Sequence, residues 1–227
     1  EIVIRQWAMK DSKSHSWVVL TRCLLRKYDL PDPLTILSLR LTKLQWKKIV
    51  KRNVHRVWSQ SIEIEAIDKS TLTYCNIDFQ PQSPHQSLQN LHTKFEIKRA
   101  NIKWKMLTGT YSTQSRRFTY KQVPSPNCLI CTEDQKEDLK HMILECPAMT
   151  EERNHHLQLI FKLIPHVLAN VNLLYSDTSF LLQFIIDHSH PMIQEKIPIL
   201  SEEIERATQQ MIYSLHQSRV NKIAMAL

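Results

Sequence analysis

Residues 126–147 read "PNCLICTEDQKEDLKHMILECP", and this stretch decides what holds the fold together. Its ligand-type side chains follow the spacing Cys128-x2-Cys131-x9-His141-x4-Cys146. A Cys-x2-Cys pair can bind one ion from a tight turn, and the "MILE" segment is short enough to bring His141 and Cys146 to the same ion. A lone cysteine is ordinarily a free thiol, but four ligand-type side chains within 19 residues favour a metal site.

The composition of this ligand set favours zinc. Three thiolates and a neutral imidazole suit the tetrahedral coordination that zinc adopts in structural sites. Four protein ligands leave no open position for a catalytic water, so we expect one structural zinc that stabilises the fold. Two cysteines lie outside the set. Cys23 is expected to be a small buried residue on a helix, and no role is assigned to Cys75.

Glycine is nearly absent, since Gly109 is the only one in 227 residues. Helices tolerate glycine poorly, whereas tight hairpins and phosphate-binding loops need it. We therefore expect a mainly α-helical fold, with bundle-like helical segments around a small Cys3His zinc element, and we exclude a Rossmann fingerprint and a P-loop. Gly109 itself is expected to allow a break in the chain's helical conformation or the close approach of another group to the backbone. Apolar periodicity and capping residues place the helical or apolar segments at 13–28, 42–66 (N-cap Thr42), 98–107, 149–170, 177–187 (N-cap Asp177) and 198–224.

These patterns divide the chain into four regions. We expect a basic helical region at 1–66, a loop or linker at 67–97, a basic segment with the zinc element at 98–150, and a C-terminal helical region at 151–227. No apolar run reaches the roughly 18 residues of a membrane span, and the first residues do not read as a signal peptide. We therefore expect an intracellular protein, nuclear or cytoplasmic, with no membrane partner.

Charge is distributed unevenly along the chain. Residues 1–127 hold 22 lysines and arginines against nine acids, a net of +13, whereas residues 128–227 hold eight against 13, a net of −5. The helix at 42–66 carries its cations on the face opposite its apolar residues, with almost no acids to pair with them. Such a helix repels itself unless an anion binds it, which predicts a polyanionic partner. The cations concerned are Lys47, Lys48, Lys51, Arg52 and Arg56.

A second basic segment, residues 98–118, interleaves cations with aromatic residues. Cations bind phosphates and aromatic rings stack on unpaired bases, so this segment also predicts contacts with RNA or DNA. The alternative is that Trp104 and Tyr111 belong to the core while the cations are simply solvated. The candidate contacts are Arg99, Lys103, Trp104, Lys105, Tyr111, Arg116 and Arg117.

The segment at 103–149 resembles the C-terminal region of reverse transcriptases from non-LTR (LINE-type) retrotransposons. In that family a Leu-Thr-Gly-Tyr-like segment precedes a Cys-x2-Cys…Glu-x3-His…Cys-Pro zinc element. The matching residues here are "LTGTY" at 107–111, the four metal-ligand candidates, Glu137 and "ECP" at 145–147. Two upstream stretches, at 16–33 and 43–54, are similar to the region that links polymerase and finger in metazoan elements. The resemblance covers roughly residues 6–155 and is vague after 160.

The resemblance implies a non-catalytic tail whose partner is the polymerase domain of the same polyprotein. The paired catalytic aspartates of the polymerase are absent, and no nucleophile–base set stands at a recognisable spacing. The acid pairs Glu137–Asp138 and Glu202–Glu203 are expected to be solvated charges at helix starts. We expect a zinc-stabilised module that binds RNA or DNA. The alternative is a protein–protein interaction module stabilised by zinc, in which the basic face serves solubility.

Overall fold

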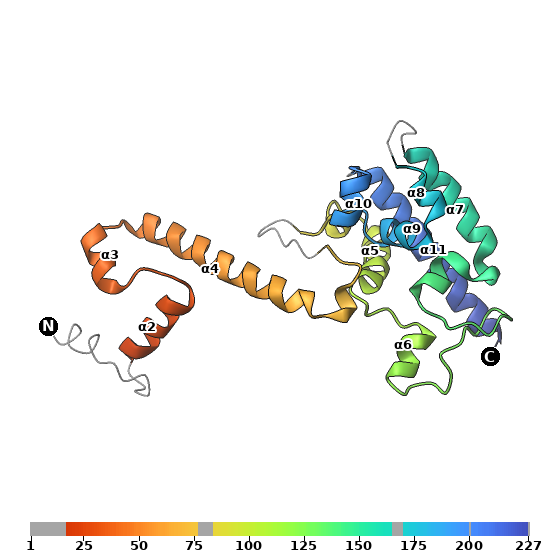
Figure 1. The fold of residues 1–227 in the computed structure, drawn as a ribbon, viewed down its shortest axis with the longest axis horizontal. Helices are drawn as coiled ribbons and strands as arrows, with labels where there is room; N and C mark the ends of the chain where they lie inside the picture. The colour runs from red at the N-terminus through yellow and green to blue at the C-terminus, as the bar shows by residue number, and fades with distance from the viewer. Residues whose placement is uncertain (1–16, 77–83, 165–169, 200, 227) are drawn as a thin grey trace. The chain divides into compact units, whose positions relative to one another are not determined.

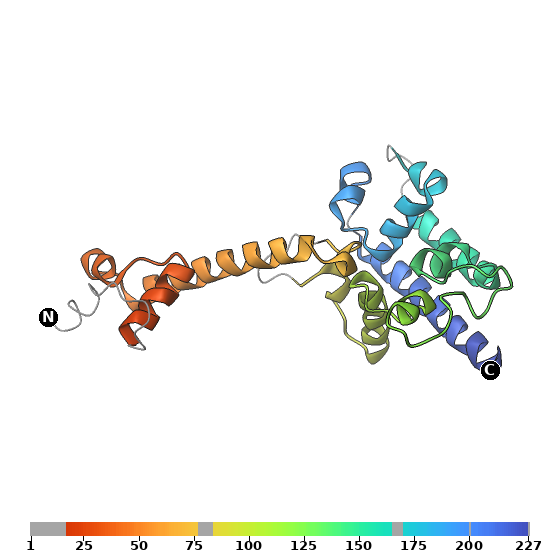
Figure 2. The same cartoon turned by 60° about the horizontal axis from the view of Figure 1, so that its bottom comes forward.

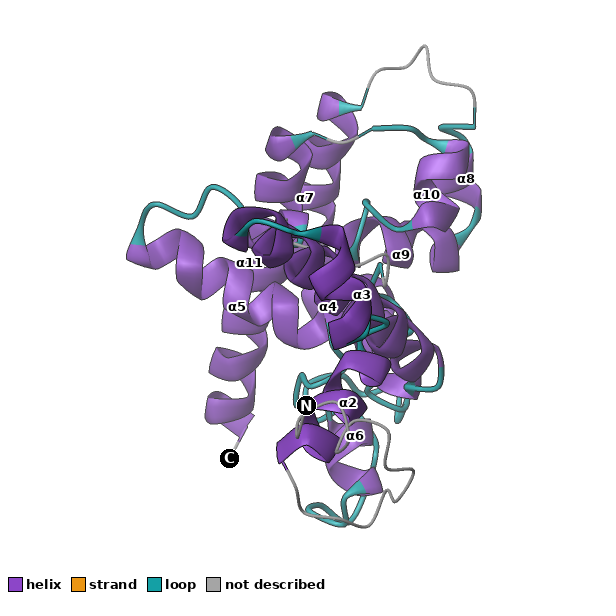
Figure 3. Cartoon of the chain, turned by 90° about the vertical axis from the view of Figure 1, so that its left-hand side faces the viewer, coloured by secondary structure: helices purple, strands orange, loops and turns teal. Residues whose placement is uncertain are grey.

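The computed structural model describes residues 17–76, 84–164, 170–199 and 201–226, which divide into two compact units (Figure 1). The first unit contains the described residues up to Asp68, and the second unit contains those from Lys69 onwards. Within the described ranges the chain forms helices and loops without a β-strand (Figure 3). Asn127 and Lys136 form an isolated antiparallel bridge. The prediction of a mainly α-helical fold is confirmed.

The described residues of the first unit form three helices, of which the last is the longest (Figure 2). They are α2 (Trp17–Lys27), α3 (Pro33–Leu39) and α4 (Lys43–Ile67). As predicted, Thr42 caps α4, and it forms a capping box with Gln45. Helix α3 was not predicted, because Pro31 and Pro33 were interpreted only as the end of the preceding helix. The fixed φ of proline also suits the first position of a new helix, and Pro33 is the first residue of α3.

Helix α2 buries a different face from the one expected. Helical spacing groups Trp17, Leu20, Leu24 and Leu25, yet of these four only Leu25 is buried, and the side chains of the other three are 64%, 56% and 56% exposed. Val18 and Val19 are buried with Leu25. Cys23 is also exposed, which corrects the expectation that it is buried. Apolar residues extend around most of this helix, so the sequence does not determine which stripe packs.

The second unit is organised around α11 (Glu202–Ala226), against which α5 (Lys94–Leu107) and α7 (Thr150–Leu163) pack. Helix α9 (Thr178–Ile186), capped by Asp177 as predicted, lies entirely in the core from Phe180 onwards. Shorter α-helices in the described part of this unit are α6 (Gln114–Thr119), α8 (Leu173–Ser176) and α10 (Pro191–Lys196). The core includes Met106, Ile143, Ile160, Phe184 and Met211, so it joins residues from the metal-ligand segment to the three long helices.

The helix boundaries differ from the predicted ones at several points. The expected linker at 67–97 contains two short 3-10 turns, Ser70–Leu72 and Gln86–Leu88, and its last residues begin α5. The last helix starts at Glu202 rather than at Pro198. Regions 98–150 and 151–227 pack together in the second unit. Three parts of the predicted helical segments lie outside the described residues: 13–16, 165–169 and residue 200.

Gly109 ends α5 in the left-handed region, with φ of 61°. Its N–H bonds the Met106 carbonyl, and Thr110 N–H bonds the Lys105 carbonyl at 2.7 Å, a pattern that closes helix C-termini. A Cβ here would lie 2.5 Å from the Thr71 carbonyl oxygen. The predicted break and the predicted close approach therefore both occur at this glycine.

We expect Gly109→Ala to lower the free energy of unfolding by at least about 1–3 kcal/mol, because it adds backbone strain and a collision with Thr71. Urea unfolding followed by circular dichroism measures the change. Ala148→Gly, at a half-buried position where alanine is native, serves as a control for the glycine–alanine difference alone. An unchanged midpoint for Gly109→Ala would contradict this packing.

Candidate metal centre

The four predicted ligands meet at one point. The donor atoms of Cys128, Cys131, His141 and Cys146 all lie within 4.8 Å of one another. Cys128 Sγ is 4.0 Å from Cys146 Sγ, and Cys131 Sγ is 3.5 Å from His141 Nε2. A disulfide has a sulfur–sulfur distance of about 2.05 Å, so these are separate thiols. The cluster could hold one metal ion with four protein ligands.

The two N-terminal ligands are presented by a short antiparallel hairpin. Cys128 N–H bonds the Gln135 carbonyl at 2.8 Å, and Glu137 N–H bonds the Pro126 carbonyl at 2.9 Å. Asp134 has a φ of 50° in the connecting loop, a conformation that aspartate tolerates better than most residues. Residues 132–136 of the connecting loop are exposed, so the loop leaves the site to the sulfurs.

The two C-terminal ligands are aligned by a π-turn over His141–Glu145. In an α-helix, side chains five residues apart differ by about 140° around the axis, because each residue turns by about 100°. Here Cys146 N–H bonds the His141 carbonyl at 2.6 Å, which is an i→i+5 bond. This wider turn brings position 146 nearly over position 141. The four-residue gap between His141 and Cys146 therefore lets both side chains bind one ion because the backbone forms this π-turn.

The imidazole of His141 is held by hydrogen bonds outside the ligand set. Its Nδ1 lies 3.3 Å from Gln135 Oε1, and its backbone N–H donates to Asp138 Oδ1 at 2.9 Å. An Nδ1–H that donates to the Gln135 amide oxygen leaves the Nε2 lone pair directed at the sulfurs. A hydrogen bond from the ring nitrogen that does not bind the metal fixes the tautomer and ring orientation of metal-binding histidines.

Burial and crowding control the protonation of the thiols. His141 and Cys146 are 2% and 1% exposed. A hydrogen bond from Cys146 lowers the pKa of the Cys128 thiol to about 5. The same hydrogen bond to Cys128, together with burial, raises the pKa of Cys146, and burial raises that of Cys131. Without a cation the cluster thus retains protons, and a bound metal would release them.

Glu137 belongs to the support of this site, which corrects the expectation of a solvated helix-start charge. Its side chain is fully buried and forms a two-pronged ion pair with Arg219 of α11, with both N···O distances 2.7 Å. It also accepts the Gln114 N–H at 2.7 Å. Asp138, Glu202 and Glu203 are exposed, as expected. The metal-ligand hairpin is thereby joined to α6 and to the last helix.

The structure removes two residues from the predicted nucleic-acid surface. Lys103 is fully buried, and its Nζ donates to Glu205 and to Thr208, each at 2.7 Å. Tyr111 is 6% exposed and its hydroxyl lies 2.8 Å from His216 Nδ1. Trp104 is half-buried and packs edge-on against His85. Neither Lys103 nor Tyr111 can reach a polyanion, because both side chains face α11.

The remaining predicted cations are accessible. On α4, Lys47, Lys48, Lys51, Arg52 and Arg56 are exposed, opposite a half-buried apolar face. Among the residues with described positions, Arg56 alone of these five forms an ion pair, with Asp29. In the second unit Lys105 is exposed, and Arg99, Arg116 and Arg117 are half-buried. The guanidinium of Arg99 lies 4.2 Å from the centre of the Phe95 ring.

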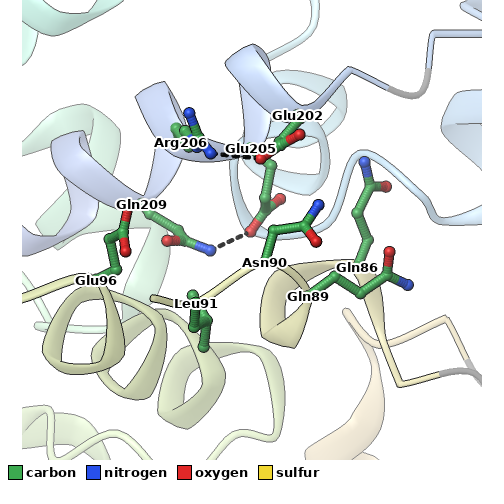
Figure 4. A pocket seen from close by; sticks show the side chains of 9 residues that line it. All are labelled: Gln86, Gln89, Asn90, Leu91, Glu96, Glu202, Glu205, Arg206 and Gln209. Atoms are coloured by element: carbon green, nitrogen blue, oxygen red, sulfur yellow. Dashed lines mark hydrogen bonds and ion pairs between the residues drawn. The ribbon is translucent and has the colours of Figure 1, made fainter. Parts of the chain in front are cut away.

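A polar pocket of ≈ 60 Å³ between the Gln86–Asn90 segment and α11 is another candidate site (Figure 4). Its carboxylates already have partners. Glu205 pairs with Lys103 and also accepts from Gln209, and Glu202 pairs with Arg206. Burial would raise the pKa of Glu205, but Lys103 and His188 outweigh it and lower that pKa to about 2. The pocket therefore presents satisfied side chains and no reactive group.

Asp187 and His85 form a buried polar cluster that superficially resembles a catalytic triad. His85 Nε2 lies 3.3 Å from Asp187 Oδ2, and His85 Nδ1 lies 2.6 Å from Ser87 Oγ. Ser87 is fully buried, and Asp187 also accepts the Asn76 N–H at 2.8 Å. A nucleophile must be accessible to its substrate, and Ser87 is not. The cluster joins Asn76 and His85 to Asp187, which directly follows α9.

Comparison with family models, curated proteins and solved structures finds no match to this chain. No helix in the described ranges is long and apolar enough to cross a membrane. Candidate functional features must therefore be judged from the structure itself. In the second unit the strongest is the metal-ligand cluster, and in the first unit it is the cationic face of α4.

Proposed function

We propose that this chain is a non-catalytic nucleic-acid-binding module, stabilised by one structural zinc, of the kind found at the C-terminus of LINE-type reverse transcriptases. RNA or DNA would be its partner, together with the polymerase domain of the same polyprotein if the chain is part of one. The cationic face of α4 carries this proposal. The ligand cluster and the sequence resemblance support it.

The choice of zinc rests on the donor atoms and their spacing. Zinc–sulfur bonds of about 2.3 Å at tetrahedral angles place two sulfurs about 3.8 Å apart. The distances of 4.0 Å between Cys128 and Cys146 sulfurs and 3.5 Å between Cys131 and His141 suit this geometry. Hard cations such as Mg²⁺ prefer oxygen ligands, and thiolates disfavour them. With all donor atoms within 4.8 Å of one another, the four residues are close enough to bind a single zinc ion.

The nucleic-acid assignment rests on the unpaired charges of α4. Lys47, Lys48, Lys51 and Arg52 are exposed within six residues of one helix, and no ion pair to any of them occurs in the described part of the chain. Closely spaced like charges destabilise a helix, and a phosphate backbone relieves that repulsion while releasing its counterions. These four cations form a cluster with no carboxylate paired to them in the described residues, which is the footprint expected for phosphate contacts.

Replacing Lys47, Lys51 and Arg52 by alanine tests this assignment. We expect weaker binding to every RNA sequence and a salt dependence flatter by about 0.7–0.9 in log–log slope for each phosphate that is no longer neutralised. Fluorescence anisotropy at several salt concentrations measures both. The matched control Lys47→Arg, Lys51→Arg, Arg52→Lys keeps the charges and should retain the slope. Equal binding by the alanine variant and the parent at every salt concentration would place the binding face elsewhere.

A protein-interaction module is the second candidate, and α2 provides its specific support. The exposed side chains of Trp17, Leu20 and Leu24 recur at three- and four-residue steps, so they form one apolar stripe of the kind that docks a partner helix. Nucleic-acid binding that barely responds to salt would favour this candidate over the first, because phosphate contacts always carry a salt dependence.

A further inference from the structure

An exposed aromatic ring stands beside the arginines of α6. Tyr120 follows this helix directly and is 57% exposed. The Arg116 guanidinium lies 5.1 Å from the centre of its ring, and Arg116 Nη2 is 3.3 Å from the Tyr120 hydroxyl. The second unit thus offers an accessible ring and cations where the sequence suggested Trp104 and Tyr111.

Tyr120 forms part of the wall of a hollow with purely positive charge. The hollow has a volume of ≈ 340 Å³, and its lining contains two arginines and no carboxylate. The lining residues are Thr110, Ser112, Arg116, Arg117, Tyr120 and Gln122. Side-chain hydroxyls and an amide supply neutral hydrogen-bonding groups around the cations. This combination suits an anionic ligand that also carries hydroxyl groups and a planar ring.

A second hollow continues the first, since Arg116 and Tyr120 line both. Its volume is ≈ 380 Å³, and hydroxyl groups dominate its wall, among them those of Thr71, Thr73 and Thr119. The carboxylate of Asp138 also lies in this wall. A phosphate would be repelled there, so the anionic part of a ligand belongs at the Arg117 end.

The shape of this groove is fixed by the fold of the unit. Arg116 Nη1 donates to the carbonyl of Gly109, the residue that packs on Thr71. Thr113 caps α6, and Gln122 N–H bonds the Arg117 carbonyl at 2.9 Å. Arg116 and Arg117 are half-buried rather than free in solvent. Side chains held in this way lose little freedom on binding, which favours affinity.

We propose that the groove around Tyr120 binds single-stranded nucleic acid, with an unpaired base stacked on the Tyr120 ring and phosphates at Arg117 and Arg116. The hydroxyl groups of the wall face the sugars. This inference rests on the proposed function and adds a second binding surface to the cationic face of α4. A duplex keeps its bases stacked on each other, so it can use the α4 face but not the ring.

Substitutions at Tyr120 test the stacking interaction. Tyr120→Leu removes the ring, whereas Tyr120→Phe keeps it. Tyr175→Leu is the matched control, because Tyr175 is 60% exposed in the same unit and lines neither hollow. The probes are an oligouridine and an oligodeoxyuridine of about 12 nucleotides, the length scale of one single-strand site, and a duplex of equal length. A 2-aminopurine in the single strands reports stacking by its fluorescence quenching.

We expect Tyr120→Leu to weaken single-strand binding by about 5- to 150-fold, the range seen when a base-stacking ring is removed. Quenching should disappear in Tyr120→Leu and persist in Tyr120→Phe and Tyr175→Leu, with duplex binding unchanged in all three. Arg117→Gln should weaken single-strand binding and flatten its salt slope. Tighter binding of oligouridine than of oligodeoxyuridine would show that the wall reads the 2′-hydroxyl, whereas equal binding would show recognition of the base and phosphate alone.

Failure of this inference is distinguishable from failure of the proposed function. If the parent protein binds single strands and Tyr120→Leu binds them equally well with quenching intact, the groove is not the site, while the α4 assignment stands. Binding of duplex alone also overturns the groove and leaves the α4 assignment in place. If the parent binds neither probe, both proposals are wrong.

Discussion

Removing the metal is expected to unfold the region around the ligand cluster and to destabilise the second unit as a whole. Structural zinc in finger peptides contributes on the order of 10 kcal/mol of apparent folding free energy, comparable with the whole stability of a domain, about 5–15 kcal/mol. The effect extends beyond the site, because Met142 and Ile143 lie between the ligands and are fully buried in the core. We therefore expect a chelator or Cys146→Ser to abolish cooperative thermal unfolding of this unit.

Circular dichroism and differential scanning calorimetry measure this change, and Cys23→Ser provides the matched control. Cys23 is exposed on α2 in the first unit and lies outside the cluster, so its replacement should leave the transition unchanged. Adding zinc to the chelated parent should restore the transition, and adding it to Cys146→Ser should not. Chelated protein that melts like the untreated parent would show that the fold does not depend on a metal.

Breaking the buried ion pair between Glu137 and Arg219 is expected to have the second largest effect. Removal of one partner from a buried pair strands a charge without a counter-ion and typically costs about 3–5 kcal/mol. Here Glu137→Ala also leaves the Gln114 N–H without its acceptor. We expect Glu137→Ala and Arg219→Ala each to lower the free energy of unfolding by this amount, measured by urea denaturation.

A double-mutant cycle tests whether the two effects share one cause. The Glu137→Ala, Arg219→Ala variant should be destabilised by less than the sum of the single variants, because neither charge is then left alone. The exposed pair Glu202–Arg206 on the same helix is the control, and Glu202→Ala should cost under about 1 kcal/mol. Additive effects at 137 and 219 would mean that the pair does not hold the metal-ligand hairpin to α11.

The features that could be predicted from the sequence are those formed by residues close together in the chain. All four metal ligands lie within one short segment, so local backbone turns are enough to bring them together. The N-caps Thr42 and Asp177 bond backbone groups two or three residues away, and both are found as expected. Short helices escaped prediction, because α3, α6, α8 and α10 have only four to seven residues, too few to establish a periodic pattern.

The errors arise where a partner lies far along the chain. Lys103 resembled a phosphate ligand because its partner Glu205 is 102 residues away. Glu137 resembled a solvated charge because Arg219 is 82 residues away, and the Tyr111 hydroxyl meets His216 at a separation of 105. Charge and aromatic spacing cannot reveal such pairs. The stacking candidate therefore shifts from Tyr111 to Tyr120, whose exposure depends on how α6 packs.

The most direct test of the central claim is the metal content of the purified chain, measured by native mass spectrometry and elemental analysis. The Cys3His cluster predicts one zinc per chain, retained in Cys23→Ser and absent from Cys128→Ser. Protein purified without chelators that contains no zinc, or a Cys128→Ser variant that still holds a full equivalent, would contradict a zinc centre formed by Cys128, Cys131, His141 and Cys146.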